Sequence, residues 1–406
     1  MLTTIGFASV YIARQDVVSS ASLLYAALFF ALYLAAHLVA RVTVPQADPY
    51  LLPMAGFLTA VGLTEIYRLD PDDAFRQGRW ILVGVAGFTL TLVLLRRDPR
   101  RLEDYKYLFG LAAIALLVLP ALPGVGTTVN GARLWIDLGP LRFQPGEFAK
   151  IALIVFLAGY LRAKREVLAQ GRLKDLGPLL LIWGGAMLVL IQTNDLGSGL
   201  LYFGIFLSML YVATARLPYV IAGAALFVGG AAGIYRLVPR VRDRVENWLD
   251  PWSDAQGSGY QIIQSHYSIA NGGFGGTGLG RGTFTTTDGD QLIPYVNTDF
   301  IYSALAQELG LVGAAALLLV FMLFVMRGFR VALLAQDGFS KLLAVGLTFG
   351  FALQTFIIVG GVLRVIPLTG ITLPFVSYGG SSILANFVLL AGLLLVSHRA
   401  NAPRVA

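Results

Sequence analysis

Long hydrophobic segments alternate with short polar segments along almost the whole chain. An α-helix needs roughly 20 apolar residues to cross the hydrocarbon core of a bilayer, and it satisfies its backbone hydrogen bonds internally. The pattern therefore predicts an all-α integral membrane protein, a polytopic helical bundle. The predicted spans lie near residues 21–40, 50–67, 80–95, 107–123, 148–161, 177–191, 196–213, 217–235, 300–326, 341–362 and 378–397. Met1–Ile12 is apolar but short, so it is either a partial further span or a segment at the membrane surface.

The composition excludes a water-soluble globular protein. Hydrophobic residues make up 57% of the chain and charged residues only 13%, whereas a soluble domain usually has about a quarter charged residues. An outer-membrane β-barrel is excluded too, because its alternating segments of about 10 residues are absent from the sequence. The chain has no cysteine, and its three histidines are far apart, so neither disulfides nor a zinc site is predicted.

Lysine and arginine set the predicted orientation, because cytoplasmic loops of membrane proteins are rich in both residues. On this rule the loops 41–49, 96–106, 162–176, 214–216 and 327–340 and the C-terminal tail are cytoplasmic. The loops 68–79, 124–147, 192–195 and 363–377 and the long segment 237–298 are then extracytoplasmic. Membrane topology thus accounts for the net charge of +7, and no nucleic-acid partner is predicted.

The segment 237–298 is a polar, glycine-rich stretch within an otherwise apolar chain, which makes it a candidate for chemistry. We expect one membrane domain over 1–406, with extra N-terminal spans in 1–49, a core in 50–399 and 237–298 as the large extracytoplasmic loop. Arg236–Asp250 has the spacing of an amphipathic helix, lying either in the membrane interface or on the rest of the loop. The glycines of 272–282 match a dinucleotide motif only superficially, without its strand and helix, and favour close packing or mobility.

The start of the predicted span at 148–161 carries two charges. Glu147 and Lys150 lie three residues apart and so share one helix face. They form either a local ion pair that caps the span or part of a functional site, since ionisable groups at a membrane edge are functional candidates. Together with Lys150, Arg133 and Arg142 could hold an anionic headgroup, because the guanidinium group suits phosphate.

Two further segments remain open from the residues alone. Thr298 and Asp299 could simply cap the helix that follows, or Asp299 could be a functional carboxylate. The segment Arg364–Ser382 is rich in Pro, Gly, Ser and Thr between two spans. Non-helical backbone at membrane depth is tolerated only inside protein or beside a cavity, so this segment indicates a re-entrant stretch next to a polar cleft.

In order along the chain, these motifs closely resemble the SEDS family (shape, elongation, division and sporulation), which includes RodA, FtsW and SpoVE. The resemblance covers roughly Leu51 to Arg399. Its landmarks are Asn130-Gly-Ala-Arg133-Leu-Trp135-Ile, Gln144-Pro-Gly-Glu147-Phe-Ala-Lys150, Asp195-Leu-Gly, Leu249-Asp-Pro-Trp252, Gly259-Tyr-Gln261, Thr298-Asp299-Phe300, Glu308-Leu-Gly310, Pro367-Leu-Thr-Gly370 and Leu373-Pro-Phe-Val-Ser377-Tyr-Gly-Gly-Ser-Ser382.

The resemblance implies about ten core spans, to which this chain adds one or two at its N-terminus, most like a RodA-type member. It also implies a peptidoglycan glycosyltransferase that polymerises lipid II and releases undecaprenyl pyrophosphate with inversion. Asp299 corresponds to the catalytic base, and the substrate-binding candidates are Arg133, Lys150, Glu147, Trp135, Gln144 and Ser377. Family members usually read Pro-Glu-x-His-Thr-Asp-Phe around the base, whereas this chain has Pro294-Tyr-Val-Asn297-Thr-Asp-Phe.

The same resemblance implies partners and a location. The partners are lipid II, membrane lipids and a class B penicillin-binding transpeptidase, which we expect to contact the spans 300–326 and 341–362. A divalent cation, Mg²⁺ or Mn²⁺, is an open candidate as cofactor, although no carboxylate cluster for a metal is visible. The expected location is the bacterial inner (cytoplasmic) membrane, multi-pass, with the active site on the extracytoplasmic side, in either elongation or division.

Two alternative functions would use the same residues. One is a flippase or transporter of lipid II, and the other is a non-enzymatic scaffold of a cell-wall complex. Against a transporter, the chain halves show no inverted repeat, and the spans are expected to hold no charged residue well inside them.

Overall fold

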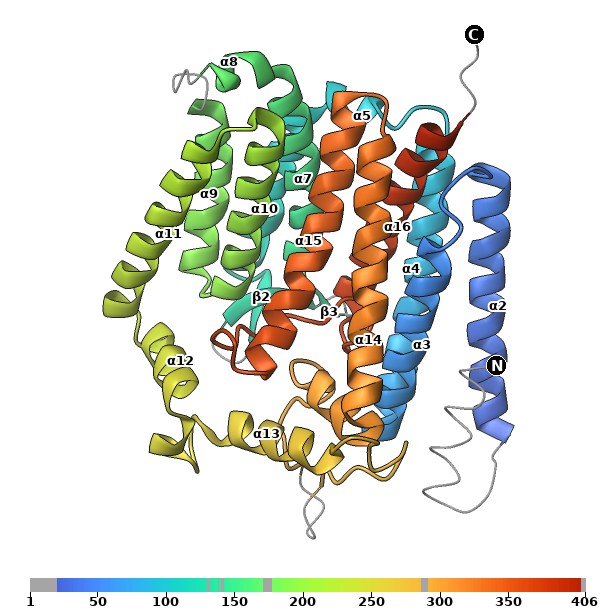
Figure 1. Cartoon of the computed structure of the whole chain (residues 1–406), viewed down its shortest axis with the longest axis vertical. Helices are drawn as coiled ribbons and strands as arrows, with labels where there is room; N and C mark the ends of the chain where they lie inside the picture. Colours follow the sequence, from blue (N-terminus) through green and yellow to red (C-terminus); the bar gives the residue numbers. More distant parts are fainter. Residues whose placement is uncertain are drawn as a thin grey trace.

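The computed structural model describes residues 20–129, 132–137, 139, 142–170, 177–285 and 291–402. Each of the eleven predicted spans corresponds to an α-helix of this part of the chain, and the helices form one bundle (Figure 1). They are α2 (Ser20–Thr43), α3 (Leu51–Leu69), α4 (Pro71–Leu95), α6 (Lys106–Val118), α7 (Gly146–Ala163), α9 (Gly177–Gln192), α10 (Leu196–Thr214), α11 (Leu217–Leu237), α14 (Ile301–Leu334), α15 (Gly338–Val362) and α16 (Gly380–Asn401). Seven of them are long and apolar enough to cross a membrane. The predicted segment Met1–Ile12 lies outside the described residues.

Two helices extend beyond their predicted bounds. The helix α4 begins at Pro71 rather than near residue 80, because Asp70 caps it by accepting hydrogen bonds from the backbone N–H groups of Asp72 and Asp73 at 2.8 and 3.2 Å. The helix α14 continues to Leu334, so most of the predicted loop 327–340 is helical. Both predicted boundaries are wrong because the prediction ends each helix at polar residues. Charged side chains can occupy a helix turn wherever they find partners.

The helices differ greatly in burial. In an apolar 18-residue stretch of α16 and of α15, 83% and 78% of the residues are buried inside the protein. The helix α7 is buried along most of its length. By contrast, none of the residues of α11 is buried. An aromatic cluster fills the centre, with ring centroids 4.3 Å apart for Phe324 and Phe351 and 5.6 Å apart for Phe375 and Phe387. The core thus lies around α7, α15 and α16, and α11 is peripheral.

A small antiparallel sheet interrupts the helical fold between α6 and α7. Its strands β1 (Gly126–Val129), β2 (Ala132–Asp137) and β3 (Arg142–Phe143) pair in the order β1-β2-β3. In the register, Thr127 faces Trp135 and Ile136 faces Phe143. The sequence predicted only an extracytoplasmic loop over 124–147, because strands this short carry no clear alternation of apolar and polar residues.

The predicted extracytoplasmic loops meet at one end of the bundle. There the segment 237–298 forms α12 (Pro239–Leu249), η3 (Pro251–Asp254) and α13 (Tyr260–Gly272), of which Figure 1 labels α12 and α13 at the lower end. The predicted cytoplasmic loops meet at the other end, where Arg399 pairs with Asp98 at 2.8 Å and Arg327 pairs with Asp48. The assignment of these ends to the two sides of the membrane stays a prediction.

The glycines of 272–282 serve close packing, one of the two roles predicted for them. Backbone N–H groups of Thr277 and Gly278 donate to the carbonyls of Gln307 and Glu308, both at 3.0 Å. A Cβ at Gly276 would collide with the carbonyl oxygen of Glu308, so only glycine allows this approach. The helix α14 is broken at the same level, where Gly310 has φ 67°.

The expectation that the spans hold no charged residue well inside them is wrong. Glu308 in α14 is 1% exposed, and its carboxylate pairs with Arg68 at 3.1 Å. The same carboxylate accepts the N–H groups of Gly280 and Gly282 at 2.8 and 3.1 Å. The buried charge is tolerated because the glycine-rich segment supplies it with partners where the helix is broken.

Candidate functional site

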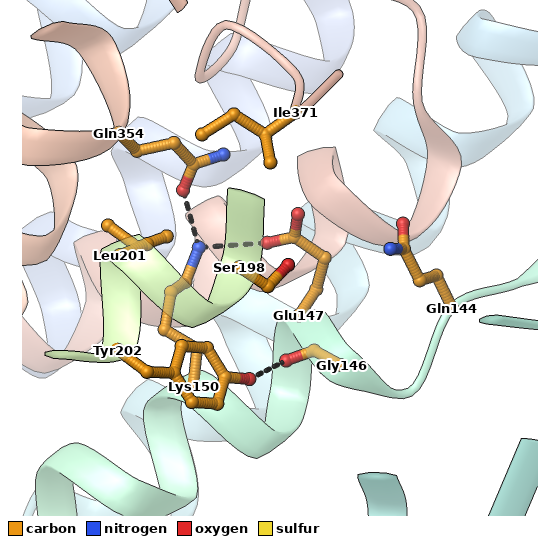
Figure 2. A pocket seen from close by; sticks show the side chains of 9 residues that line it. All are labelled: Gln144, Gly146, Glu147, Lys150, Ser198, Leu201, Tyr202, Gln354 and Ile371. Carbon is orange, nitrogen blue, oxygen red and sulfur yellow. Dashed lines mark hydrogen bonds and ion pairs between the residues drawn. The ribbon is translucent and has the colours of Figure 1, made fainter. Parts of the chain in front are cut away.

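Lys150 is the centre of a buried polar cluster near the start of α7. The side chain is 3% exposed, and its Nζ lies 2.8 Å from Oε2 of Glu147 and 2.6 Å from Oε1 of Gln354 on α15 (Figure 2). The amide of Gln354 in turn donates to the carbonyl of Thr372 at 2.9 Å. The predicted pair of Glu147 and Lys150 therefore forms, and Gln354 on α15 gives the buried ammonium group a second acceptor.

This cluster lines a small pocket of about 10 Å³, which has room for about one water molecule. The hydroxyl of Tyr202 fixes one wall by donating to the carbonyl of Gly146 at 2.6 Å. The lining residues are Gln144, Gly146, Glu147, Lys150, Ser198, Leu201, Tyr202, Gln354 and Ile371, as Figure 2 shows. Three of the predicted substrate-binding residues, Gln144, Glu147 and Lys150, thus surround one cavity.

Asp299 lies in the loop before α14 but does not cap that helix. The N-cap residue is Phe300 and no side-chain hydrogen bond caps it, so the capping part of that alternative is wrong, while the charge of Asp299 does stand directly before the first turn of the helix. Instead, the carboxylate of Asp299 and the guanidinium group of Arg244 on α12 both lie beside Gly370, and the charge of Arg244 acts on the carboxylate. Oδ2 of Asp299 and Nη2 of Arg244 lie 3.4 and 3.8 Å from the position of a Cβ added to Gly370. Arg244 is held there by donating from Nη1 to the carbonyl of Thr369 at 3.1 Å.

Burial and charge tune the acidity of these groups. Burial raises the pKa of Asp299 to about 6, although the positive charge of Arg244 and the hydroxyl of Thr298 act in the opposite direction. Burial also raises the pKa of Asp195, the N-cap of α10. Hydrogen bonds from Ser198 oppose that rise; the charge of Glu147 adds to it, and the charge of Arg244 opposes it. Asp195 is thus electrostatically coupled both to the Lys150 cluster, through Glu147, and to Arg244.

The segment 369–372 physically joins these two groups of residues. The carbonyl of Thr369 holds Arg244, and Gly370 lies against Asp299. The next residue, Ile371, lines the pocket, and the carbonyl of Thr372 accepts from Gln354. The segment is non-helical and lies beside the pocket, as predicted, whereas its re-entrant position in the membrane stays a prediction. The pocket and Asp299 thus adjoin the same segment.

The loops around Asp299 carry unusual backbone conformations. Asn194, Tyr295, Arg364 and Phe375 all have φ between 57° and 63°, a left-handed conformation that is uncommon for residues other than glycine. Such conformations persist only where surrounding contacts maintain them, and they cluster at functional sites. The site is therefore assembled from constrained loops.

Arg133 and Trp135 lie on β2, outside this region. Nε and Nη2 of Arg133 donate to the carbonyls of Gly126 and Leu122, both at 3.1 Å. Trp135 pairs with Thr127 across the hairpin. The guanidinium group of Arg133 is thus used to bind backbone of the hairpin and its approach, and among the described residues no hydrogen bond or ion pair joins it to Asp299 or Lys150.

Ser377 is a buried residue that contacts the loop of Asp299. It is 3% exposed, donates from its hydroxyl to the carbonyl of Thr298 at 2.6 Å and accepts the N–H of Leu373 at 2.9 Å. In this structure the predicted substrate-binding serine therefore fixes the loop of Asp299, since both backbone contacts occupy its hydroxyl.

Sequence reasoning missed three residues of the site. Arg244 is one of several charges within the predicted amphipathic helix 236–250, and the sequence does not single it out. Asp195 appears only as part of a family landmark. Gln354 is a polar side chain within an apolar span, and that was the signal that could have revealed it, because such residues are costly in a membrane unless paired.

Comparisons with known proteins match nearly the whole chain. The model of a family described as "Cell cycle protein" (FtsW/RodA/SpoVE) matches residues 49–402. The peptidoglycan glycosyltransferase RodA of Mycobacterium tuberculosis is 44% identical over 400 residues, which cover 93% of this chain and 84% of the relative. The stage V sporulation protein E of Bacillus subtilis is 36% identical over 331 residues, covering 82% and 89% of the two chains.

Solved structures show the same fold. A chain from a study named "Structural coordination of polymerization and crosslinking by a peptidoglycan synthase complex" aligns with a TM-score of 0.73 at 31% identity, covering 87% of this chain and 98% of that one. The rod shape determining protein RodA of Thermus thermophilus aligns with a TM-score of 0.65 at 28% identity, covering 88% and 98%.

Proposed function

The chain belongs to the FtsW/RodA/SpoVE family of multi-pass membrane proteins, and we propose that it is the peptidoglycan glycosyltransferase that polymerises lipid II into glycan strands. The relatives named for this activity support the proposal along nearly the whole chain. The single observation that carries the mechanism is the juxtaposition of a partly buried carboxylate, Asp299, with a fixed cation, Arg244.

In the proposed reaction Asp299 acts as the general base. The hydroxyl of the acceptor sugar attacks the anomeric carbon of the donor, and its proton passes to the carboxylate of Asp299. The new glycosidic bond forms while the bond from the anomeric carbon to the pyrophosphate oxygen breaks, with inversion at that carbon. Undecaprenyl pyrophosphate leaves with the electron pair. A pKa near 6 suits the task, because the base is mostly ionised at neutral pH yet basic enough to accept a proton.

Cations are needed to stabilise the pyrophosphate leaving group. Arg244 lies beside Asp299, and Lys150 reaches the connected pocket with Glu147 orienting it. We keep Gln144 as a substrate contact because its side chain lines that pocket (Figure 2). The leaving-group role of Arg133 and the substrate role of Trp135 remain proposals that rest on the family motif, and Ser377 is assigned to holding the Asp299 loop.

A divalent cation remains part of the proposal. The described residues contain no group of three or more His, Cys, Asp or Glu side chains that could hold a metal. Mg²⁺, however, is commonly bound by one or two carboxylates together with substrate phosphates. Asp195 is the carboxylate that would fit this role, because the charges of both Glu147 and Arg244 act on its pKa and it therefore lies near both. A bound Mg²⁺ would neutralise charge on the pyrophosphate.

The proposed setting is the bacterial cytoplasmic membrane, with the Asp299 end of the bundle on the extracytoplasmic side, as the basic loops predict. The proposed partner is a class B penicillin-binding transpeptidase, in line with the coordination of polymerisation and crosslinking named for the related complex. Of the two predicted contact spans, α14 offers more surface, because α15 is largely buried while Leu319, Met322 and Met326 of α14 are 55–67% exposed.

The decisive experiment compares the wild type with Asp299→Asn, which keeps size and polarity but cannot accept the proton. Purified protein in detergent is incubated with lipid II, and glycan length is measured on gels. We expect polymer from the wild type only, and an unchanged melting temperature for the variant. Normal polymer from Asp299→Asn would remove this residue from the mechanism. A flippase or a scaffold would make no glycan in either form, so the assay also separates these alternatives.

A further inference from the structure

Trp248 at the end of α12 and Arg364 after α15 bind each other in both directions. The indole Nε1 of Trp248 donates to the carbonyl of Arg364 at 2.9 Å. The guanidinium group of Arg364 donates from Nε and Nη2 to the carbonyl of Trp248, at 3.1 and 2.8 Å, and from Nη2 to the carbonyl of Leu249 at 3.0 Å. The last carbonyls of a helix lack partners within the helix and favour a positive charge, so Arg364 caps α12.

The helix α12 has no fully buried residue with which to pack on the bundle. None of its residues is buried, and its closest backbone packing is with its sequence neighbours α11 and η3. The preceding helix α11 has no buried residue either. The position of α12 therefore depends on polar contacts rather than on a hydrophobic interface.

The contact has a direct connection to the site. Trp248 and Arg244 are four residues apart on α12, so they lie on the same face of the helix. Both bind the segment that follows α15, Trp248 at Arg364 and Arg244 at Thr369. Arg364 has φ 57°, a conformation that surrounding contacts must maintain. Hydrogen bonds at two points, Trp248 with Arg364 and Arg244 with Thr369, thus hold one face of α12 against the backbone of this segment.

We propose that Trp248 and Arg364 are positioning residues that hold α12 in the register in which Arg244 lies beside Gly370, close to Asp299. The hydrogen bonds of both side chains join α12 to the segment after α15, and we propose that their effect on the reaction passes through Arg244, which binds the same segment. This proposal rests on the proposed function for its kinetic consequence, but the geometric part, the fixing of α12, can be measured without the reaction.

The kinetic test uses two variants. Trp248→Phe keeps an aromatic ring but removes the indole N–H donor, and Arg364→Lys keeps the positive charge but removes the planar guanidinium group with its paired donors. We expect each to lower the kcat/KM for lipid II about tenfold, the factor that corresponds to one hydrogen bond of ordinary strength. The acid limb of the pH profile should move to higher pH. We expect the same shift for Arg244→Gln, because the charge of Arg244 lowers the pKa of Asp299. The matched control is Trp252→Phe, an exposed tryptophan that stacks edge-on with Tyr267 and should behave as wild type.

A double variant separates positioning from general damage. If Trp248 acts through Arg244, the double variant Arg244→Gln with Trp248→Phe is no slower than Arg244→Gln alone. A further tenfold loss in the double variant would overturn the proposal, and so would an unshifted pH profile in Trp248→Phe.

The geometric test uses the absence of cysteine from the chain. The substitutions Asp243→Cys and Leu311→Cys place spin labels at exposed positions of α12 and α14. We expect one narrow distance distribution in the otherwise wild-type protein and a broad one after Arg364→Lys. A distribution that stays narrow in Arg364→Lys refutes the fixing of α12. Full activity of Asp299→Asn would refute the proposed function instead, and it would leave the label distances unchanged.

Discussion

The side-chain amide of Asn297 donates a hydrogen bond of 2.7 Å to Oδ2 of Asp73. This bond ties the loop of Asp299 to the first turn of α4, more than two hundred residues away in the sequence. The backbone carbonyl of Asn297 also accepts the N–H of Tyr378 at 2.8 Å. The loop of Asp299 is therefore held from two sides, by α4 and by the segment before α16.

This relationship predicts the behaviour of two variants at one position. Asn297→Ala removes the donor to a carboxylate, a loss of about 2 kcal/mol that we expect to appear mainly as reduced turnover. Asn297→His restores the residue usual in the family, which can donate to Asp73, and should keep most of the activity. Polymerisation rates and melting temperatures of both variants check this. Equal activity of Asn297→Ala and the wild type would show that the bond does not position the loop.

The pKa of Asp299 predicts the pH dependence of the reaction. A general base must be ionised, so the kcat/KM should rise with pH through a midpoint near 6 and level off above it. At pH 5 the rate should be about tenfold below the plateau, because only about a tenth of Asp299 is ionised there. Since Arg244 lowers this pKa, Arg244→Gln should move the midpoint to higher pH. Initial rates at low lipid II concentration, measured from pH 4.5 to 8.5, give both midpoints; a flat profile argues against Asp299 as the base.

Gly370 is predicted to be intolerant of a side chain. Its φ of +75° is costly for any L-residue by about 1 kcal/mol, so an added methyl group would strain the backbone beside Asp299, although the methyl itself would make only an ordinary contact of 3.4 Å with Oδ2. Gly370→Ala should therefore lower turnover well beyond its modest effect on stability. The control is Gly184→Ala in α9, where an added Cβ meets nothing within 4 Å. Comparable rates for the two variants would show that the left-handed conformation at Gly370 does not matter for the site.

The buried pair of Glu147 and Lys150 predicts a split between stability and activity. Lys150→Met leaves the carboxylate of Glu147 without its ion-pair partner at 12% exposure, which should cost about 3 kcal/mol of stability. The double variant Glu147→Gln with Lys150→Met should recover most of that stability, because no unpaired charge remains. It should stay inactive if Lys150 contacts the pyrophosphate. Thermal unfolding in detergent and the polymerisation assay separate the two effects.

The sequence alone determined the class of the fold and the family. Hydrophobic segments of membrane-spanning length located all eleven helices, because in lipid each segment must satisfy its own backbone and its composition is therefore a local property. The motif around Asp299 identified the catalytic candidate. The spacing of Glu147 and Lys150 placed both on one helix face, since this spacing too depends only on local geometry.

Only the tertiary structure decided which cation lies close to Asp299. From the sequence, Arg133 and Lys150 were the candidates, and Arg244 was one of several charges on a surface helix. Its partner Thr369 lies 125 residues further along the chain. No local pattern encodes such a contact, because it depends on how α12 docks on the segment after α15. The same holds for Ser377 and Gln354, whose roles follow from hydrogen bonds between helices and loops that are distant in the sequence.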